Sequence, residues 1–344
     1  METPLMRDEE RGEEPQQHSI GRSVLLPMVL SMALLGVAAT SRSSYDSTDL
    51  LELSAATAPK AVKLIRLSRL LVEFGRVVLV FMFIGASGSL GVSGFTGIAQ
   101  YFKYPAPSFM GLMAFLFCSL GSIGVIAGPL MGCAMTSIIG AKLLIIFLII
   151  ATYSGHYKPL APLPPGMEKM GHWYAMWKNI AIIGALLMII GYDMRILSTE
   201  VPEILEMMHL SKMGWLRYAR IVIEGGKVVL MSVFFVAAMN GVSGYTGIAT
   251  FFGFPCPSFM AVMAMLFLLV GSVSIIAGPL VQCPVTSIAG SVLLIVFMLP
   301  ATYAGHYKPM RTSEGMEATK QQQQLMKNVS IIGALIVIIG YETQ

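Results

Sequence analysis

Hydrophobic residues in this chain gather in long runs, and polar residues are concentrated in the stretches between them. A helix needs about 20 apolar residues to cross the hydrocarbon core of a bilayer. The alternation that marks a strand is absent from the runs, and backbone groups in lipid must be hydrogen-bonded internally, so the runs predict membrane-spanning helices. We predict eight spans, at about residues 74–92, 108–128, 133–152, 178–192, 225–243, 258–278, 283–303 and 327–341.

The composition supports a membrane location. Of the 344 residues, 55% are hydrophobic and only 12% are charged, whereas a soluble domain is about 45–50% apolar and about 25% charged. So few charges cannot cover the surface of a water-soluble protein, which excludes a soluble enzyme, a nucleic-acid-binding domain and a disordered chain. We therefore predict an all-α integral membrane protein in contact with a lipid bilayer, and nothing in the composition assigns it to a particular membrane.

The sequence contains an internal repeat. Residues 91–159 align without a gap to residues 241–309, and 42 of the 69 aligned positions are identical. Extending the match in both directions defines unit 1 as residues 69–193 and unit 2 as residues 220–344, each with four hydrophobic runs. Because four is an even number, both units enter the membrane from the same side. This predicts a parallel repeat, related by an axis along the membrane normal.

Four further segments lie outside the two units. Residues 1–22 are polar and acidic, residues 41–68 form a polar to amphipathic connector, and residues 194–219 form an amphipathic linker expected to lie on the membrane surface. Residues 23–40 are apolar, and their length suits either a cleaved targeting signal or a ninth span. Both interpretations stay open, since the residues before this segment are acidic and a signal usually begins with positive charge.

Lys142 is the only lysine or arginine well inside a predicted span, and Val292 stands at the equivalent position of unit 2. A charged side chain is costly in a bilayer and therefore calls for a functional explanation. Lys142 either anchors its helix by reaching headgroups or a polar partner, or serves a ligand or a transport pathway. We expect its side chain to point into the bundle or toward the boundary between the units, near Thr136 or Ser137, and not toward lipid.

Charged residues also recur at the start of the first helix of each unit. Glu73 and Arg76 in unit 1 correspond to Glu224 and Lys227 in unit 2. A spacing of three residues places each pair on one face of a helix. We expect two ion pairs near the membrane surface, with a ligand-binding role as the alternative.

His156 and His306 follow the third helix of each unit within the repeated motif Tyr-x-Gly-His-Tyr-Lys-Pro, which predicts that both lie at one membrane face. Histidine can ligate haem iron or donate its N–H to a quinone. An anchoring role at the helix end is the simpler interpretation, quinone binding is compatible with the pair, and haem ligation is disfavoured. No Walker motif, nucleophile elbow, HExxH motif or CxxC pair occurs, so we assign no catalytic residue and no metal ligand.

Each unit resembles the DoxX family of four-helix membrane proteins. The resemblance rests on the segments after the first helix, the glycine-punctuated second helix, the end of the third helix and the close of the fourth, at Gly97–Ala99, Pro105–Pro107, Gly128, His156 and Gly191–Asp193. The glutamate that the family often carries in its second helix is replaced here by Cys118 and Leu268.

The resemblance implies a function within a larger assembly. Members of the family are associated with quinone-linked oxidoreductase complexes, and related groups with the trafficking or assembly of membrane proteins. We therefore expect a non-catalytic subunit that contacts other membrane-protein subunits in a quinone-linked complex. The alternative is a small-solute transporter or a cargo or assembly receptor, which the repeated unit and the charge of Lys142 favour.

Overall fold

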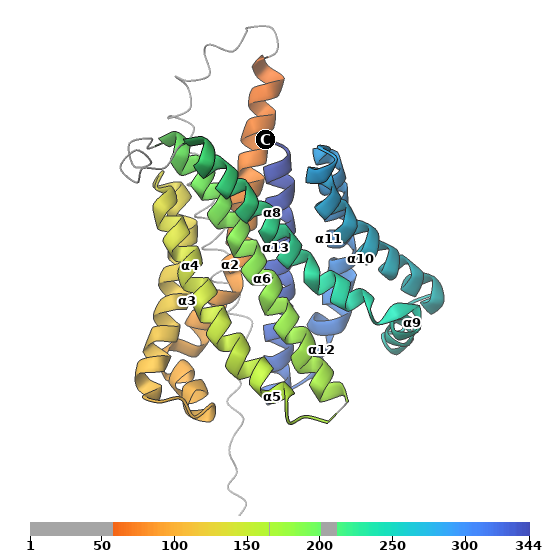
Figure 1. The fold of residues 1–344 in the computed structure, drawn as a ribbon. Coiled ribbons are helices and arrows are strands. Elements are labelled where there is room, and N and C mark those ends of the chain that lie inside the picture. The colour runs from red at the N-terminus through yellow and green to blue at the C-terminus, as the bar shows by residue number, and fades with distance from the viewer. Residues whose placement is uncertain (1–57, 165, 201–211) are drawn as a thin grey trace, which may run out of the picture.

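The computed structural model describes residues 58–164, 166–200 and 212–344, which form a bundle of long helices (Figure 1). These residues contain no strand. The long helices are α2 Ala58–Tyr101, α3 Pro107–Leu130, α4 Ala134–Thr152, α6 Met167–Glu200, α8 Lys212–Ala238, α9 Gly241–Phe251, α10 Pro257–Leu280, α11 Pro284–Thr302 and α13 Gly315–Glu342. Short elements follow the third helix of each unit: the π-helical turns η2 Tyr153–Tyr157 and η3 Tyr303–Tyr307, and the helices α5 Lys158–Leu160 and α12 Lys308–Thr312.

Eight helices in the described part of the chain are long and apolar enough to cross a membrane. They are Arg66–Tyr101, Pro107–Leu130, Ala134–Leu160, Glu168–Ser198, Met213–Ala238, Pro257–Leu280, Pro284–Thr312 and Glu317–Glu342. By length and composition this confirms the predicted all-α, multi-pass architecture, because each helix contains most of one predicted run. The segments 1–22 and 23–40, most of 41–68 and the middle of 194–219 lie outside the described residues.

Several helix boundaries differ from the prediction. The first helix of unit 1 continues to Tyr101 with a bend at Gly91, whereas α8 ends at Ala238 and α9 begins at Gly241. Both glycines have a positive φ, which glycine adopts without a steric penalty. The last helix of each unit begins well before its apolar run, so the polar residues that precede each run are largely helical. Glutamine, lysine and methionine are good helix formers, and the helix therefore continues beyond the apolar residues.

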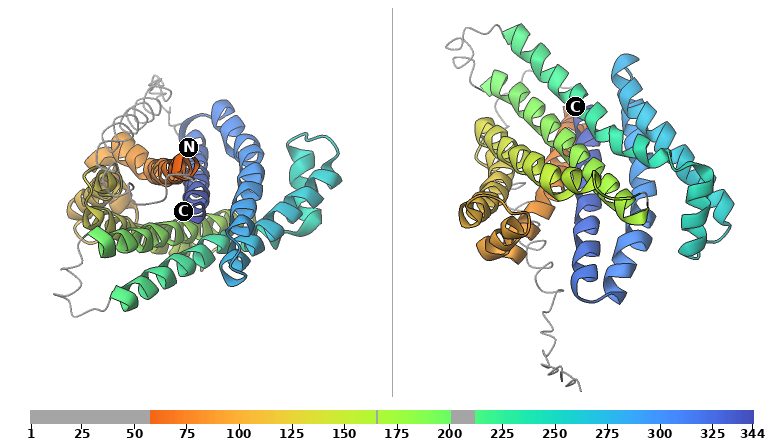
Figure 2. Two further views of the ribbon diagram at one scale, coloured as in Figure 1. Left: turned by 90° about the horizontal axis from the view of Figure 1, so that it is seen from above. Right: turned by 60° about the horizontal axis from the view of Figure 1, so that its bottom comes forward.

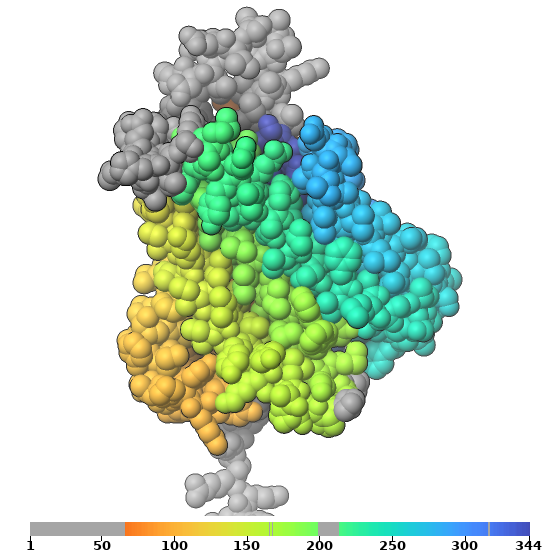
Figure 3. All heavy atoms as spheres, viewed as in Figure 1, coloured from red at the N-terminus to blue at the C-terminus, as the bar shows by residue number. Residues whose placement is uncertain are grey.

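The four helices α2, α6, α8 and α13 form the centre of the molecule, with α3 and α4 on one side and α10 and α11 on the other (Figure 2). The first helix of each unit packs along the last helix of the other unit: α2 lies along α13, and α6 along α8. The region around α9 projects at one edge of the molecule (Figure 3). The two units therefore share one interior.

Glycines bring the backbones of these central helices close together. A Cβ atom on Gly75 of α2 would lie only 2.7 Å from the carbonyl oxygen of Gly333 on α13. On Gly226 of α8, a Cβ atom would lie 2.6 Å from the carbonyl oxygen of Gly184 on α6. The sequence repeat relates these two contacts to one another, so the same close approach occurs twice. Small residues are typical of interfaces between helices that pack in lipid.

Candidate functional site

Polar side chains collect at both ends of the central bundle. We call the cluster around Arg76 and Lys227 the ion-pair end. Arg76 on α2 is fully buried and donates to both carboxylate oxygens of Asp193 on α6, with an Nη1–Oδ2 distance of 2.9 Å. Its Nη1 also lies 2.9 Å from Ser137 Oγ, and its Nε lies 3.6 Å from a carboxylate oxygen of Glu73. Such bidentate, charge-assisted contacts are the strongest hydrogen bonds that side chains form.

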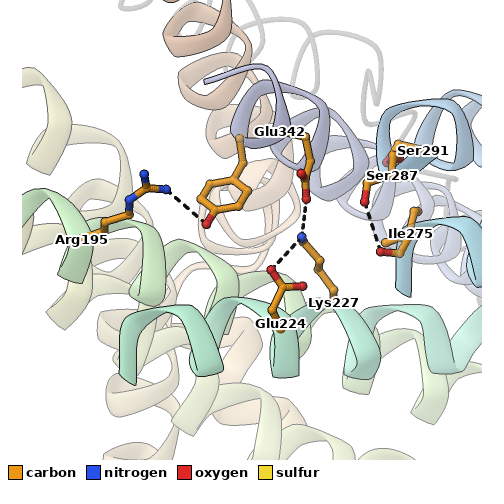
Figure 4. A network of polar contacts seen from close by, with 8 residues as sticks. Arg195, Glu224, Lys227, Ile275, Ser287, Ser291 and Glu342 are labelled. Carbon is orange, nitrogen blue, oxygen red and sulfur yellow. Dashed lines mark hydrogen bonds and ion pairs between the residues drawn. The ribbon is translucent and has the colours of Figure 1, made fainter. Parts of the chain in front are cut away.

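Unit 2 contains a corresponding cluster. Lys227 on α8 is 1% exposed and forms ion pairs with Glu342 on α13 and with Glu224, the latter at 3.1 Å (Figure 4). Its ammonium nitrogen also lies 5.3 Å from the centre of the Tyr341 ring. Arg195 points toward the same tyrosine, and its Nη1 donates to the Tyr341 hydroxyl at 3.3 Å. Both clusters therefore neutralise a buried cation with two carboxylates.

The expected pairs Glu73–Arg76 and Glu224–Lys227 are formed, but each has a second and more buried partner that we did not predict. Those partners, Asp193 and Glu342, come from the last helix of the same unit. The signal was present in the sequence, because the last hydrophobic run of both units ends in Ile-Ile-Gly-Tyr followed by an acidic residue.

At the opposite end of the bundle, lysines of one unit contact histidines of the other. We call this cluster the lysine–histidine end. Lys327 Nζ of unit 2 lies 3.2 Å from His156 Nε2 of unit 1, and Lys178 Nζ of unit 1 lies 3.4 Å from His306 Nε2 of unit 2. An ammonium group can only donate hydrogen bonds. Each histidine must therefore present an unprotonated Nε2, and so be neutral, when its lysine carries a charge.

The two lysine–histidine contacts differ in their further partners. Lys178 also donates to Gln324 Oε1 at 3.1 Å, and His306 Nδ1 lies 3.0 Å from Gln321 Oε1. Lys327 has His156 as its one hydrogen-bonding partner among the described residues. Within the same residues, no carboxylate forms an ion pair with either lysine. The positive charge at this end is therefore not neutralised as it is at the ion-pair end.

A cavity of about 290 Å³ opens beside Lys327. It lies between α2, α3 and α4 of unit 1, and α13 of unit 2 closes one side. Its wall is mostly apolar and includes the aromatic and methionine side chains of Phe83, Phe95, Phe117, Phe147, Met110 and Met113. Its polar end contains Lys327, His156 and Asn179, and the buried Oδ1 of Asn179 has no hydrogen-bond partner among the described residues. We did not predict this cavity, because helices α2, α3, α4 and α6 of unit 1 and helix α13 of unit 2 all contribute to it.

Lys142 does not lie where we expected it. It is exposed on the outer face of α4, together with Ile139 and Ile146, while Ala141 and Leu144 are fully buried. Since successive residues of a helix are rotated by about 100°, the face through Ala141 and Leu144 points inward and Lys142 points outward. The expected contact with Thr136 or Ser137 is therefore wrong. The described residues also contain no group of three or more metal-ligating side chains.

Comparison with protein-family models, with curated proteins and with solved structures found no match to this chain.

Proposed function

We propose that this chain is a non-catalytic, DoxX-like subunit of a larger membrane complex, and that a helix of another subunit covers the outer face of α4. The family resemblance supports a link to quinone-dependent redox complexes. The observation that carries the proposal is Lys142, a charged side chain exposed on a face that otherwise presents Ile139, Ile146 and Ile149. A carboxylate on a neighbouring transmembrane helix is the partner that would neutralise it.

The depth of Lys142 supports this argument. It lies two turns after the start of α4, about 12 Å along the axis at roughly 1.5 Å per residue, inside a hydrocarbon core of about 30 Å. A lysine near the centre of a membrane helix costs about 2.5–3.5 kcal/mol on insertion scales, and less where the side chain reaches the headgroups. The equivalent Val292 is also exposed and carries no charge. We therefore expect the partner to contact unit 1 and not unit 2.

The test is purification from native membranes in a mild detergent, comparing the parent with Lys142→Val, which gives unit 1 the residue of unit 2. We expect the parent to elute as a stoichiometric assembly and Lys142→Val to elute alone. Val292→Leu is the matched control and should keep the assembly. Haem or flavin absorbance in the assembly supports the redox link. A parent protein that elutes alone, at the same size as Lys142→Val, would contradict the proposal.

The cavity favours a second candidate function, a small-solute transporter or a cargo or assembly receptor. Its volume and its single polar end suit a small amphipathic molecule that enters from the bilayer. For the transporter, purified protein in liposomes should move a solute without any partner. Ala114→Phe, which fills the cavity from α3, should abolish that movement, and Ala264→Phe at the equivalent position of unit 2 should leave it intact. Equal flux in both variants would argue against a pathway through the cavity.

A further inference from the structure

We infer that the cavity in unit 1 binds an amphipathic anion, with a carboxylate or phosphate headgroup at Lys327 and an aliphatic chain along the aromatic and methionine wall. This goes beyond the proposed subunit role, because it assigns a ligand class to a site on a different face of unit 1 from Lys142.

The charge balance of the site calls for an anion. Lys327 is 9% exposed, and a buried ammonium group is costly unless it is paired. It has three N–H donors, and within the described chain only His156 Nε2 accepts from it. Its remaining donors have no acceptor among the described residues, and the side chain lines the cavity. An anionic headgroup at this point would supply both the missing acceptors and the missing charge.

The surroundings of Lys327 strengthen this assignment. Lys178 is close enough for electrostatic repulsion between the two ammonium groups, and an anion beside Lys327 would reduce that repulsion. Lys178 itself is held by His306 and Gln324, so Lys327 is the lysine available to a ligand.

The rest of the cavity fits a hydrocarbon chain. Phe147 packs edge to face against both Phe83 and Phe95, and these rings line the cavity together with Met110 and Met113 of α3. The volume of about 290 Å³ lies just below the range of about 300–1,000 Å³ for ligand pockets. It accommodates a headgroup and part of one chain, and not a complete two-chain phospholipid. A fatty acid and a single-chain phospholipid share the required chemistry.

The binding of four probes to the full chain in a neutral detergent tests this inference by native mass spectrometry. The probes are oleate, oleoyl lysophosphatidate, oleyl alcohol and a short-chain ubiquinone. We expect one or both anions to bind, and the alcohol and the quinone to bind at least tenfold more weakly. Binding of oleate alone identifies a fatty-acid site, and binding of the lysophosphatidate alone identifies a phospholipid-derived ligand. Equal binding of the alcohol or of the quinone overturns the inference.

Variants locate the site. Lys327→Gln should weaken the binding of the anions by about 10- to 100-fold, as expected for the loss of a charged hydrogen bond. The binding of oleyl alcohol should not change. Lys320→Gln, at an exposed lysine of the same helix, is the control and should bind like the parent. If Lys327→Gln fails to fold, Ala114→Phe against Ala264→Phe gives the same comparison by filling the cavity.

The outcome is independent of the proposed assembly. Lys142→Val should bind oleate like the parent, because its side chain lies on the outer face of α4. Anion affinity that survives in both Lys327→Gln and Ala114→Phe would place the anion elsewhere and overturn the inference.

Discussion

At the ion-pair end, Arg76 and Lys227 each face carboxylates of their own unit, whereas at the lysine–histidine end Lys178 and Lys327 each face a histidine of the other unit. The carboxylates fasten the first helix of a unit to its last helix and neutralise the charge. The histidines link the two units and leave the charge in place. Structural stabilisation and binding capacity are thus found at opposite ends of the same four helices.

Helix packing also differs between the two ends, and it is tighter at the ion-pair end. Gly191 meets the backbone of Ala219 and Gly340 meets that of Ser68 at the ion-pair end, where no space is left for a side chain on either glycine. Toward the lysine–histidine end, the side chain of Met326 on α13 lies against Gly85 of α2. The cavity opens at this end. We therefore expect substitutions at the ion-pair end to affect stability and those at the lysine–histidine end to affect binding.

The largest effect is expected from Arg76→Met. Removing the guanidinium leaves Asp193 buried without a counter-charge, and breaking a buried ion pair from one side costs about 3–5 kcal/mol. The free energy of unfolding in mixed detergent micelles should fall by that amount. The double variant Arg76→Met/Asp193→Leu removes the most buried carboxylate together with its partner, and most of the stability should return. Equal losses in the single and double variants would show that the ion pair is not the cause.

A smaller loss is expected from Gly75→Ala. The added methyl group would lie 2.7 Å from the carbonyl oxygen of Gly333, and overpacking of this kind costs about 1–3 kcal/mol. Gly88 lies on the same helix, and a methyl group added there would meet no atom within 4 Å, so Gly88→Ala is the matched control. The same unfolding measurement should show no loss for Gly88→Ala. Similar values for both variants would mean that α2 and α13 separate more easily than the contact indicates.

The lysines of the other end should respond differently from Arg76. Lys178→Met leaves Gln324 and His306 without a donor, which we expect to cost about 1–3 kcal/mol of unfolding free energy if both stay buried. Lys327→Met removes a charge that no carboxylate pairs within the described residues, so without ligand its stability should change by less than about 1 kcal/mol, or rise. A loss at Lys327→Met as large as that at Arg76→Met would remove the contrast between the ends.

Cysteine labelling tests which end faces which side of the membrane and leaves stability unchanged. Cys133 and Cys283 precede α4 and α11 at the ion-pair end, whereas Cys256 precedes α10 at the opposite end. An impermeant maleimide added outside sealed vesicles should label either the first two or the third. The hydrogen bond from Thr286 lowers the pKa of the Cys283 thiol, which favours the reactive thiolate. Labelling of Cys133 and Cys283 from opposite sides would contradict the parallel arrangement.

The helices were predictable because their length and hydrophobicity are local properties. The direction of Lys142 was not, since α4 is apolar on nearly every face and its inward face is set only by its neighbours. The repeated Ile-Ile-Gly-Tyr-acid ending marked Asp193 and Glu342, but they lie more than a hundred residues from Arg76 and Lys227. The sequence therefore did not show which cations they pair with. The cavity depends on helix α13 closing over unit 1, an arrangement that follows from the packing of the two units and not from either one.

The packing of α2 along α13 also sets an order of events during synthesis. About 240 residues separate the end of α2 from the end of α13, and ribosomes add roughly 5–20 residues per second. The glycine-lined face of α2 is therefore present in the membrane for roughly 10 to 50 s before its partner exists. During the first part of that interval Arg76 also lacks Asp193. Nascent chains stalled before α13 would thus present an unfilled helix surface, which is the state that membrane insertion factors and quality-control proteases would encounter.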